Sequence, residues 1–296
     1  MSSVCTTFAI RILKLKAMIT FPCCKINLGL NVVGVRNDGF HNIETVFYPV
    51  PLTDVLEIKK MDDRFPCVGD IDIHVTGDYP CGEESQNLVV KAYNLIATDY
   101  EIPRIHAHLY KRIPVQSGLG GGSADGAYMI RLLDERFRLN MGNAEMERYA
   151  AKLGADCPFF ISAETAYATG IGDVLEPADD EYGNLHGYWI AIVRPDIAVS
   201  TAEAYKNIVP RKPEKNCRMV VRQPIETWRE ELRNDFEAPV FKEHPELEAI
   251  KEQLYDLGAV YAQMSGSGSA IYGLFKEQPQ DIKKTFEGSF ASVLRL

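Results

Sequence analysis

The feature that most constrains the fold is a glycine-rich stretch from Pro114 to Ala124, with the sequence PVQSGLGGGSA. Four of the five residues from Gly118 to Gly122 are glycine, so the backbone there can turn tightly and approach a ligand closely. From Ser123 onward, apolar residues recur at helical spacing as far as Phe137, which predicts a helix. Backbone amides at a helix start, with the helix dipole behind them, form a site for anions. The stretch therefore predicts a phosphate-binding loop rather than a plain flexible connection.

Two better-known phosphate motifs do not fit this loop. A P-loop requires a lysine directly after its second conserved glycine, and no lysine follows these glycines. The dinucleotide pattern GxGxxG also fails. Its last position falls on Ser123 when the pattern starts at Gly118, and on Asp125 when it starts at Gly120. The loop is thus a different kind of phosphate cradle, and a dinucleotide-dependent oxidoreductase is disfavoured.

Length and charge narrow the class of protein further. The 296 residues suit one large domain or two modest ones, and 46% apolar with 25% charged residues is ordinary for a globular protein. The net charge is −9, so the chain gains no general counterion-release attraction for nucleic acid. We therefore expect a small-molecule partner and no nucleic-acid partner.

The cysteines and histidines suggest no metal site. Seven cysteines without a CxxC pair favour reduced thiols in a cytoplasmic protein over a disulfide framework or a zinc site. His106 and His108 share one face of a predicted strand, but no third ligand follows at a suitable spacing. We interpret this pair as structural.

No apolar run approaches the roughly 18 to 20 residues that span a bilayer, so we expect no membrane partner. Residues 1–17 are basic, contain no acid and include one short apolar stretch. We interpret them as a disordered or mis-annotated extension that precedes a start at Met18. A targeting segment is the alternative, although no small-residue cleavage site follows. A monomer or a homodimer is expected.

Strands and helices are interleaved along the chain, which predicts an α+β protein. Strands are expected at Ile26–Val35, Val46–Val50, Asp54–Ile58, Ile71–Val75, Ile105–Tyr110, Tyr188–Val193, Ala259–Met264 and Ala270–Phe275. Helices are expected at Asn87–Thr98, Ser123–Phe137, Asn143–Leu153 (with Asn143 as the N-cap), Thr227–Phe236 and His244–Leu257. The interleaving in both halves predicts a domain boundary near Ala163–Tyr167.

Three further segments carry groups suited to phosphate chemistry, although each also has a plain structural explanation. KINL, from Lys25 to Leu28, opens an apolar strand, where a lysine is commonly a solvated end. Asp156 follows a predicted helix end, where a lone aspartate commonly caps or turns the chain. MSGSG, from Met264 to Gly268, lies between two strands and would by itself suit a hairpin turn equally well.

Together these segments and the loop resemble the GHMP family of small-molecule kinases, in the family's order and spacing, over nearly the whole chain after Met18. The loop is shared across the family, whereas KINL together with GAD at Gly154–Asp156 is more selective. Further segments that agree are DGFH at Asp38–His41, Glu44-Thr45, ATGIGD at Ala168–Asp173 and Asn234-Asp235. The resemblance implies a two-lobed GHMP kinase fold. Its N-terminal ATP-binding lobe, similar to ribosomal protein S5 domain 2, would cover residues 18–165, and a ferredoxin-like C-terminal lobe would cover residues 166–296.

The resemblance also implies a reaction, the transfer of a phosphoryl group from ATP to an alcohol. Asp156 would take the proton from the substrate hydroxyl, and Lys25 would lie beside both, keeping the carboxylate ionised and favouring a developing alkoxide. Mg²⁺ would accompany ATP, with Ser123 as a candidate to orient phosphate or metal; a full set of metal ligands does not follow from the sequence. The implied ATP-binding residues are Pro114, Val115, Gln116, Ser117, Gly118, Leu119, Gly120, Gly121, Gly122, Ser123 and Ala124, with Ser265, Gly266, Ser267 and Gly268 supporting the phosphate loop.

The resemblance is strongest to family members whose substrate is a cytidine diphosphate-linked methylerythritol, and it implies that the cytosine lies between two aromatic rings. A tyrosine and a phenylalanine are usual at these positions. This sequence has Phe40 and Tyr205 instead, which preserves two stacking faces. His41 would hydrogen-bond the edge of the cytosine, and Asn27 would line the same pocket. A turn histidine without a ligand is the alternative for His41.

Two other functions remain open. Another GHMP kinase, acting on mevalonate, homoserine or a sugar, would share the glycine-rich loop, but the Phe40-His41 turn and the pairing of Lys25 with Asp156 speak against it. A nucleotide-binding protein that performs no chemistry would be expected to have lost Lys25 or Asp156, and both are present.

Overall fold

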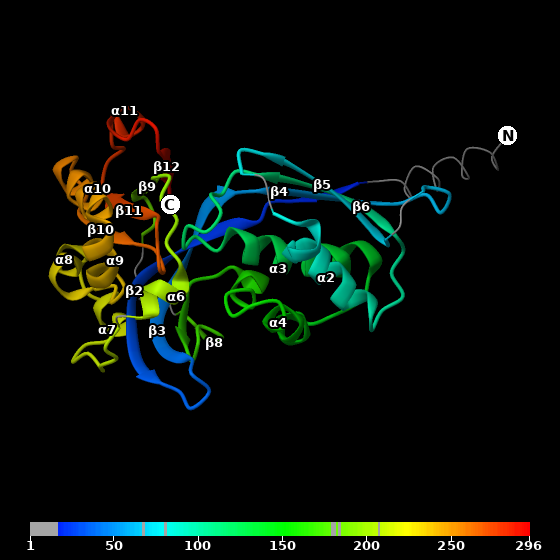
Figure 1. Ribbon diagram of the computed structural model, residues 1–296, viewed down its shortest axis with the longest axis horizontal. Coiled ribbons are helices and arrows are strands. Elements are labelled where there is room, and N and C mark those ends of the chain that lie inside the picture. Colours follow the sequence, from blue (N-terminus) through cyan, green and yellow to red (C-terminus); the bar gives the residue numbers. More distant parts are fainter. Residues whose placement is uncertain (1–16, 67–68, 80–81, 179–181, 183–184, 207) are drawn as a thin grey trace. The chain divides into compact units, whose positions relative to one another are not determined.

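The structure is a computed structural model that describes residues 17–66, 69–79, 82–178, 182, 185–206 and 208–296 (Figure 1). The predicted extension lies outside these residues except for Ala17, as do Cys5, Cys67 and Cys81. Four cysteines are described, and none of them is part of a disulfide: Cys23, Cys24, Cys157 and Cys217.

The chain forms two compact units, each assembled from separate segments. Unit 1 comprises Met1–Pro22, of which 17–22 are described, Thr53–Ile113 and Gly122–Ser162. Unit 2 comprises Cys23–Leu52, Pro114–Gly121 and Ala163–Leu296. Contacts therefore group two N-terminal segments with the C-terminal part of the chain. The simple division into domains 18–165 and 166–296 stays a prediction.

The elements alternate as the sequence predicts (Figure 1). The strands are β1 (Met18–Thr20), β2 (Cys23–Val35), β3 (His41–Thr53), β4 (Val55–Lys60), β5 (Ile71–Gly77), β6 (Ile105–Lys111), β7 (Ala166–Thr169), β8 (Val174–Pro177), β9 (Trp189–Arg194), β10 (Tyr261–Met264), β11 (Ile271–Phe275) and β12 (Phe290–Arg295). The helices are α2 (Leu88–Ala97), α3 (Gly121–Phe137), α4 (Asn143–Ala151), α5 (Phe159–Ser162), α6 (Thr201–Lys206), α7 (Cys217–Val220), α8 (Trp228–Glu231), α9 (Glu237–Glu243), α10 (Pro245–Asp256) and α11 (Ile282–Thr285), with 3-10 turns η1 (Glu84–Gln86) and η2 (Ile225–Thr227).

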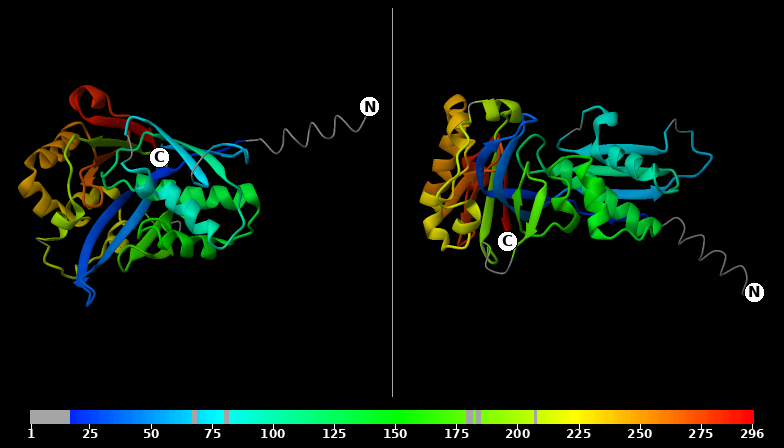
Figure 2. Two further views of the ribbon diagram at one scale, coloured as in Figure 1. Left: turned by 45° about the vertical axis from the view of Figure 1, so that its right-hand side comes forward. Right: turned by 90° about the horizontal axis from the view of Figure 1, so that it is seen from below.

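Unit 1 is a four-stranded sheet with helices on one side. The strand order is β1-β4-β6-β5, and β5 runs parallel to β6 with Ile71 opposite Ile105. Helices α2, α3 and α4 lie together on one face of this sheet (Figures 1 and 2). On β6 the alternation predicted from the sequence is present: Ala107 and Leu109 are buried, whereas His108 is exposed.

The predicted histidine pair is engaged by neighbouring strand residues. The ring of His106 bonds through Nδ1 to Asp72 Oδ2 at 2.8 Å, and Nε2 of His108 lies 2.8 Å from Thr76 Oγ1. Among the residues that the structure describes, no group of three His, Cys, Asp or Glu side chains could hold a metal ion.

Unit 2 contains two antiparallel sheets, β2-β3-β7-β8 and β10-β11-β9-β12. In the second sheet the chain runs from β9 through helices to the β10–β11 hairpin and then through α11 to β12, with every neighbouring pair antiparallel. This is the βαββαβ order of a ferredoxin-like fold, so that prediction is confirmed.

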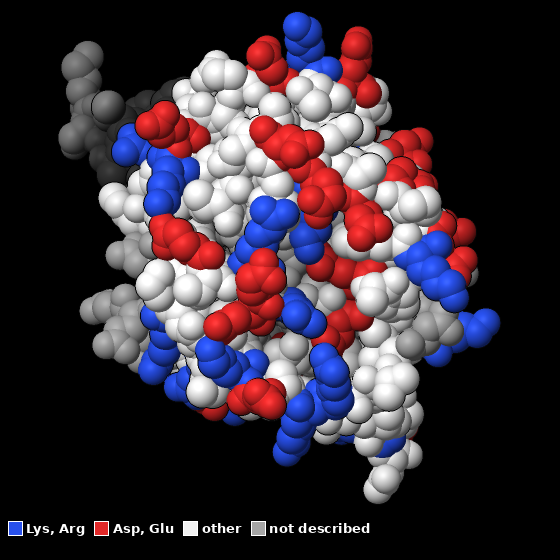
Figure 3. Space-filling model, turned by 90° about the vertical axis from the view of Figure 1, so that its left-hand side faces the viewer, with Lys and Arg blue, Asp and Glu red and all other residues white. Residues whose placement is uncertain are grey.

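Charge is mixed on the face shown in Figure 3, where acidic and basic side chains are interspersed. That pattern suits a solvated surface rather than a single-sign platform for a polyanion. Within the described part of the chain, none of the helices combines the length and the apolar character that crossing a membrane requires.

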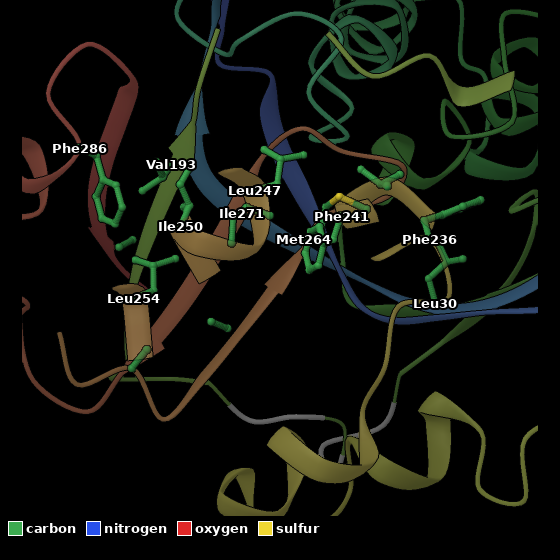
Figure 4. Packing of buried hydrophobic residues seen from close by; sticks show 14 of the residues in the cluster. Leu30, Val193, Phe236, Phe241, Leu247, Ile250, Leu254, Met264, Ile271 and Phe286 are labelled. Atoms are coloured by element: carbon green, nitrogen blue, oxygen red, sulfur yellow. The ribbon is translucent and has the colours of Figure 1, made fainter. Parts of the chain in front are cut away.

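The core of the ferredoxin-like part follows from the amphipathic helix α10. Leu247, Ile250 and Leu254 recur on one face of this helix and are buried against the sheet that carries Val193 and Ile271 (Figure 4). Fully burying an aliphatic side chain of this size contributes about 1.5 to 3 kcal/mol. The helical periodicity predicted between His244 and Leu257 therefore identifies the face of α10 that packs into the core.

Two local predictions are wrong. Helix α4 begins at Asn143 itself, and its N-cap is Gly142 in an extended conformation, so Asn143 is not the cap. The helix expected at Thr227–Phe236 stops at Glu231, because the next residues pair with β2 instead. Leu30 N donates to Arg233 O at 2.9 Å, and Asp235 N donates to Leu30 O at 2.9 Å. Tertiary pairing overrides local propensity there.

Candidate functional site

The glycine-rich loop is held in unit 2 by the second glycine loop, as the sequence predicts for a support. Gly118 has a φ of +78°, and a Cβ on it would lie 1.9 Å from Ser265 O, so only glycine fits. Ser265 Oγ donates to Gly118 O at 2.9 Å, and Ala270 N donates to Ser117 O at 3.0 Å. The structure thus brings these two loops into direct contact.

Helix α3 starts two residues earlier than predicted, at Gly121 rather than Ser123. Gly121 and Gly122 therefore belong to its first turn, where backbone amides have no partner within the helix. A Cβ on Gly122 would meet no atom within 4 Å, so a ligand can approach this backbone closely. The start of α3 keeps the anion-binding character that the sequence indicates.

Lys25 is not a solvated strand end. It is 3% exposed, its backbone N donates to Leu119 O at 2.9 Å, and its Nζ donates to Asn27 Oδ1 at 2.7 Å. The ammonium nitrogen also lies 4.9 Å from the centre of the Phe47 ring. Strand β2 is therefore hydrogen-bonded to the glycine-rich loop at Lys25, whose cationic side chain is buried.

Asn27 links this cation to Thr45, which the family resemblance includes in the pair Glu44-Thr45 without giving it a role. Asn27 is 1% exposed, and its Nδ2 donates to Thr45 Oγ1 at 2.9 Å; Thr45 is completely buried and donates in turn to Gly29 O at 2.5 Å. Thr45 stands on β3, and its place beside Asn27 depends on how β2 and β3 pair. A threonine in an apolar strand is a weak signal without that register.

Of the two rings predicted to hold a base, Phe40 and Tyr205, the structure places Tyr205 beside His41. Tyr205 on α6 stacks with His41, with ring centres 4.6 Å apart and planes at 25°, and meets Phe236 edge-on at 4.8 Å. Phe40 is 58% exposed. The helix that carries Tyr205 begins at Thr201, whose hydroxyl lies 3.0 Å from Ser267 Oγ in the second glycine loop.

Asp156 belongs to unit 1, in a half-buried turn between α4 and α5. It adjoins Cys157, whose thiol forms a hydrogen bond with Ser123 near the start of α3. Burial, together with the charge of Asp156, raises the pKa of the Cys157 thiol to about 12 despite that bond. The thiol is therefore a small core group, and the turn of Asp156 is packed close to the start of α3.

Unit 1 also contains a buried ion cluster that was not predicted, and one of its members, Asp125, lies near the start of α3. Lys111 Nζ pairs with Asp54 and, at 2.6 Å, with Asp125 Oδ2; these three side chains are at most 4% exposed. Asp54 Oδ1 also accepts from the backbone N of Ile113 at 2.8 Å. Burial raises the pKa of Asp125 to about 8, and Asp125 Oδ1 has no hydrogen-bond partner among the described residues.

Comparison with known proteins connects both units to one family. The model of the GHMP kinases N terminal domain matches residues 87–164, and that of the GHMP kinases C terminal domain matches residues 219–290. The chain is 46% identical over 276 residues to the 4-diphosphocytidyl-2-C-methyl-D-erythritol kinase of Bacteroides fragilis, covering 92% of this chain and 97% of that protein.

Solved structures agree with this likeness. A crystal structure of a 4-(cytidine 5'-diphospho)-2C-methyl-D-erythritol kinase superposes with a TM-score of 0.76 at 27% identity, covering 94% of this chain and all of that one. The mevalonate kinase of Methanococcus jannaschii superposes with a TM-score of 0.66 at 13% identity, covering 95% and 98% of the two chains, which shows a shared fold alone.

Proposed function

Because the chain belongs to the GHMP kinase family, we propose that it transfers the γ-phosphoryl group of ATP to the 2-hydroxyl of 4-diphosphocytidyl-2-C-methyl-D-erythritol, in the non-mevalonate route to isopentenyl diphosphate. The observation that carries the proposal is the buried Lys25 on a strand that hydrogen-bonds to the glycine-rich loop. A cation fixed beside a phosphate loop is what phosphoryl transfer requires, since that reaction depends on positioning and on charge stabilisation.

The loop from Pro114 to Ala124 supplies the ATP site. Its glycines and the first turn of α3 offer backbone amides to the phosphates, and Ser265 to Gly268 hold the loop in shape through the bond from Ser265 Oγ to Gly118 O. Val115 and Gln116 are exposed at the edge of the loop, where they are available to the nucleoside.

Asp156 and Lys25 carry the chemistry in this proposal. Asp156 accepts the proton of the substrate hydroxyl, and Lys25 stabilises the negative charge that develops on oxygen. Asp156 is half-buried in this turn, so the residue is partly exposed to solvent. The Cys157 thiol next to it, with its pKa raised to about 12, does not compete as a base.

Mg²⁺ fits as a companion of ATP rather than as a resident ion. The described residues offer no group of three ligands, and Mg²⁺ bound to nucleotides takes most of its oxygens from phosphates and water. The Ser123 hydroxyl, half-buried near the start of α3, is the protein oxygen we assign to it. When bound, the ion neutralises charge between the phosphates.

The cytidine end of the substrate is assigned to Phe40, His41 and Tyr205. Tyr205 supplies a stacking face that is braced from behind by Phe236, and exposed Phe40 is available as the second face. His41 now stacks on Tyr205, so a cytosine that stacks there displaces the imidazole toward the edge of the base, where it can hydrogen-bond.

The test is ATP-dependent phosphorylation of a panel that contains 4-diphosphocytidyl-2-C-methyl-D-erythritol, mevalonate and homoserine. We expect turnover of the cytidine compound alone. Turnover of mevalonate or homoserine in its place would contradict the assignment, and ATP binding without any turnover would favour a non-catalytic nucleotide-binding protein. Asp156→Asn serves as the control for chemistry, because it should bind ATP normally and lose most turnover, by about 10² to 10⁴-fold.

A further inference from the structure

We propose that Thr45, acting through Asn27, is a positioning residue that orients the Lys25 ammonium group for phosphoryl transfer. The proposal rests on the proposed function, since it assumes that Lys25 stabilises the reacting oxygens. It goes beyond the roles implied by the family resemblance, because it places Asn27 behind Lys25 instead of against the substrate.

The direction of each hydrogen bond follows from the proton count. The Gly29 carbonyl can only accept, so Thr45 must use its single hydroxyl proton on it, at 2.5 Å. Thr45 Oγ1 is then an acceptor, and the Asn27 group at 2.9 Å from it must be the NH₂ end of the amide. The orientation of the Asn27 amide is thereby determined by chemistry and not only by its placement.

This orientation decides what faces Lys25. With the NH₂ group directed at Thr45, Asn27 presents Oδ1 to the ammonium group, which donates to it at 2.7 Å. In a flipped amide, the NH₂ group of Asn27 would face the ammonium group of Lys25. Both groups are donors, so no hydrogen bond could form between them. The hydroxyl of Thr45 therefore selects the only amide orientation that can hold the lysine.

The surroundings leave this relay little room to relax. Asn27 and Thr45 are 1% and 0% exposed, so water does not substitute for a lost partner. The backbone of β2 is fixed at two points by the β10–β11 hairpin: Tyr272 Oη donates to Asn27 O at 2.8 Å, and Gly29 N donates to Gln263 Oε1 at 2.9 Å. The relay lies on β2 and β3 of one sheet and is thus attached to the other sheet of unit 2.

Thr45 offers a clean test because two of its variants separate shape from chemistry. Thr45→Val keeps the branched shape and removes the hydroxyl, whereas Thr45→Ser keeps the hydroxyl and removes a methyl group. We expect Thr45→Val to lower kcat by about 10- to 100-fold, because a displaced catalytic group costs that much, with KM for ATP unchanged within about twofold. Thr45→Ser should recover most of kcat.

Tyr149→Phe is the control in unit 1, since it also removes the hydroxyl of a buried residue, which donates to Asp99 Oδ2 at 2.8 Å. It should leave kcat unchanged. A Thr45→Val enzyme with wild-type kcat, or a Thr45→Ser enzyme as impaired as Thr45→Val, would overturn the proposal.

Two further measurements keep the inference decidable if Thr45→Val does not fold. Asn27→Asp replaces the NH₂ group by an oxygen that faces the acceptor side of Thr45, so kcat should again fall at least about tenfold; wild-type kcat would refute the relay. In a Lys25→Met background, single-turnover rates should change less than about twofold on adding either variant, because residues that act through one group are not additive. Additive losses there would assign Thr45 a purely structural role.

The proposed function is tested separately by the wild-type enzyme. If the wild-type protein phosphorylates the cytidine substrate but Thr45→Val and Thr45→Ser have the same kcat, only the relay is wrong. If the wild-type protein phosphorylates none of the panel, the proposed function itself is wrong.

Discussion

Among the residues that the structure describes, two lysines are buried, one in each compact unit, and different kinds of group contact them. Lys25 in unit 2 is 3% exposed and is held by the neutral amide of Asn27 and the face of Phe47. Lys111 in unit 1 is 1% exposed and pairs with the carboxylates of Asp54 and Asp125.

The difference lies in the groups that contact each lysine and in the role that follows from them. Burial would lower the pKa of Lys111, but the neighbouring carboxylates more than offset this and raise it. The positive charge of Lys111 is therefore compensated by carboxylates within unit 1. For Lys25, the Asn27 amide oxygen accepts a hydrogen bond from the ammonium group at 2.7 Å and so contributes to its orientation. The two lysines therefore differ in the contacts that orient them, because Lys111 belongs to a buried ion cluster and Lys25 is hydrogen-bonded to a neutral amide.

The largest expected effect concerns activity in unit 2. Lys25→Met removes the cation and keeps most of the volume, so kcat should fall by about 10³-fold, the loss typical of removing a donor that stabilises developing negative charge. The melting temperature should change less than it does in Lys111→Met. Steady-state kinetics with thermal unfolding of the same samples measures both, and retention of more than a tenth of kcat would contradict a catalytic role.

Lys111→Met should have the complementary effect. Removing one partner of a buried ion cluster leaves two carboxylates in a dry interior, and such changes cost about 3 to 5 kcal/mol of the free energy of unfolding. Urea unfolding measures this loss, while kcat per folded molecule should stay close to wild type. Lys215→Met is the control, since it breaks an exposed pair with Glu231 and should change stability little. Equal stability of both variants would mean that the cluster is not structural.

A smaller effect is expected from pH. The pKa of Asp125 is about 8 in the folded protein against an ordinary value of 3.8, because burial and the neighbouring charge of Asp54 outweigh the attraction of Lys111. Between these two values the folded state binds a proton that the unfolded chain lacks, so stability falls as pH rises toward 8 and changes no further above it. The contribution is about 1 kcal/mol per pH unit at most.

Asp125→Asn provides the comparison for this prediction, because it keeps the shape and cannot titrate. The wild-type free energy of unfolding should fall relative to that of Asp125→Asn between pH 6 and pH 8. Parallel curves would show that Asp125 is ionised throughout this range.

How much of this could be predicted from the sequence depends on whether a feature is local. The glycine-rich loop and the helix after it are encoded in neighbouring residues, and so is the alternation on β6. The ion cluster is not, because Asp54 and Lys111 are 57 residues apart and meet only when β4 pairs with β6. Thr45 likewise becomes part of the site only through the register of β3 against β2.

The segment after Trp228 shows the same limit from the other side. Its apolar spacing predicts one helix, yet the chain leaves the helix after Glu231 so that Asn234 can bridge to Leu30. The gain lies in contacts with residues that are far away in sequence. The family resemblance marks Asn234 as a shared residue, but only the structure shows which atoms it holds.

Asn234 supplies the smallest expected effect and extends the comparison to a third buried polar group. It is 3% exposed, and its Nδ2 donates to Met264 O and to Gly266 O, both at 2.8 Å, which fixes the loop that supports Gly118. Its partners are neutral, so Asn234→Ala should cost only the net value of its bonds, on the order of 1 kcal/mol each. Because those bonds shape the phosphate loop, KM for ATP should rise about three- to tenfold, while KM for the cytidine substrate stays unchanged.

Asn216→Ala is the control, because it removes the cap of α7. It should lower stability by a similar amount without changing either KM. If both asparagine variants raised KM for ATP equally, the second glycine loop would be no more coupled to the nucleotide than the rest of unit 2.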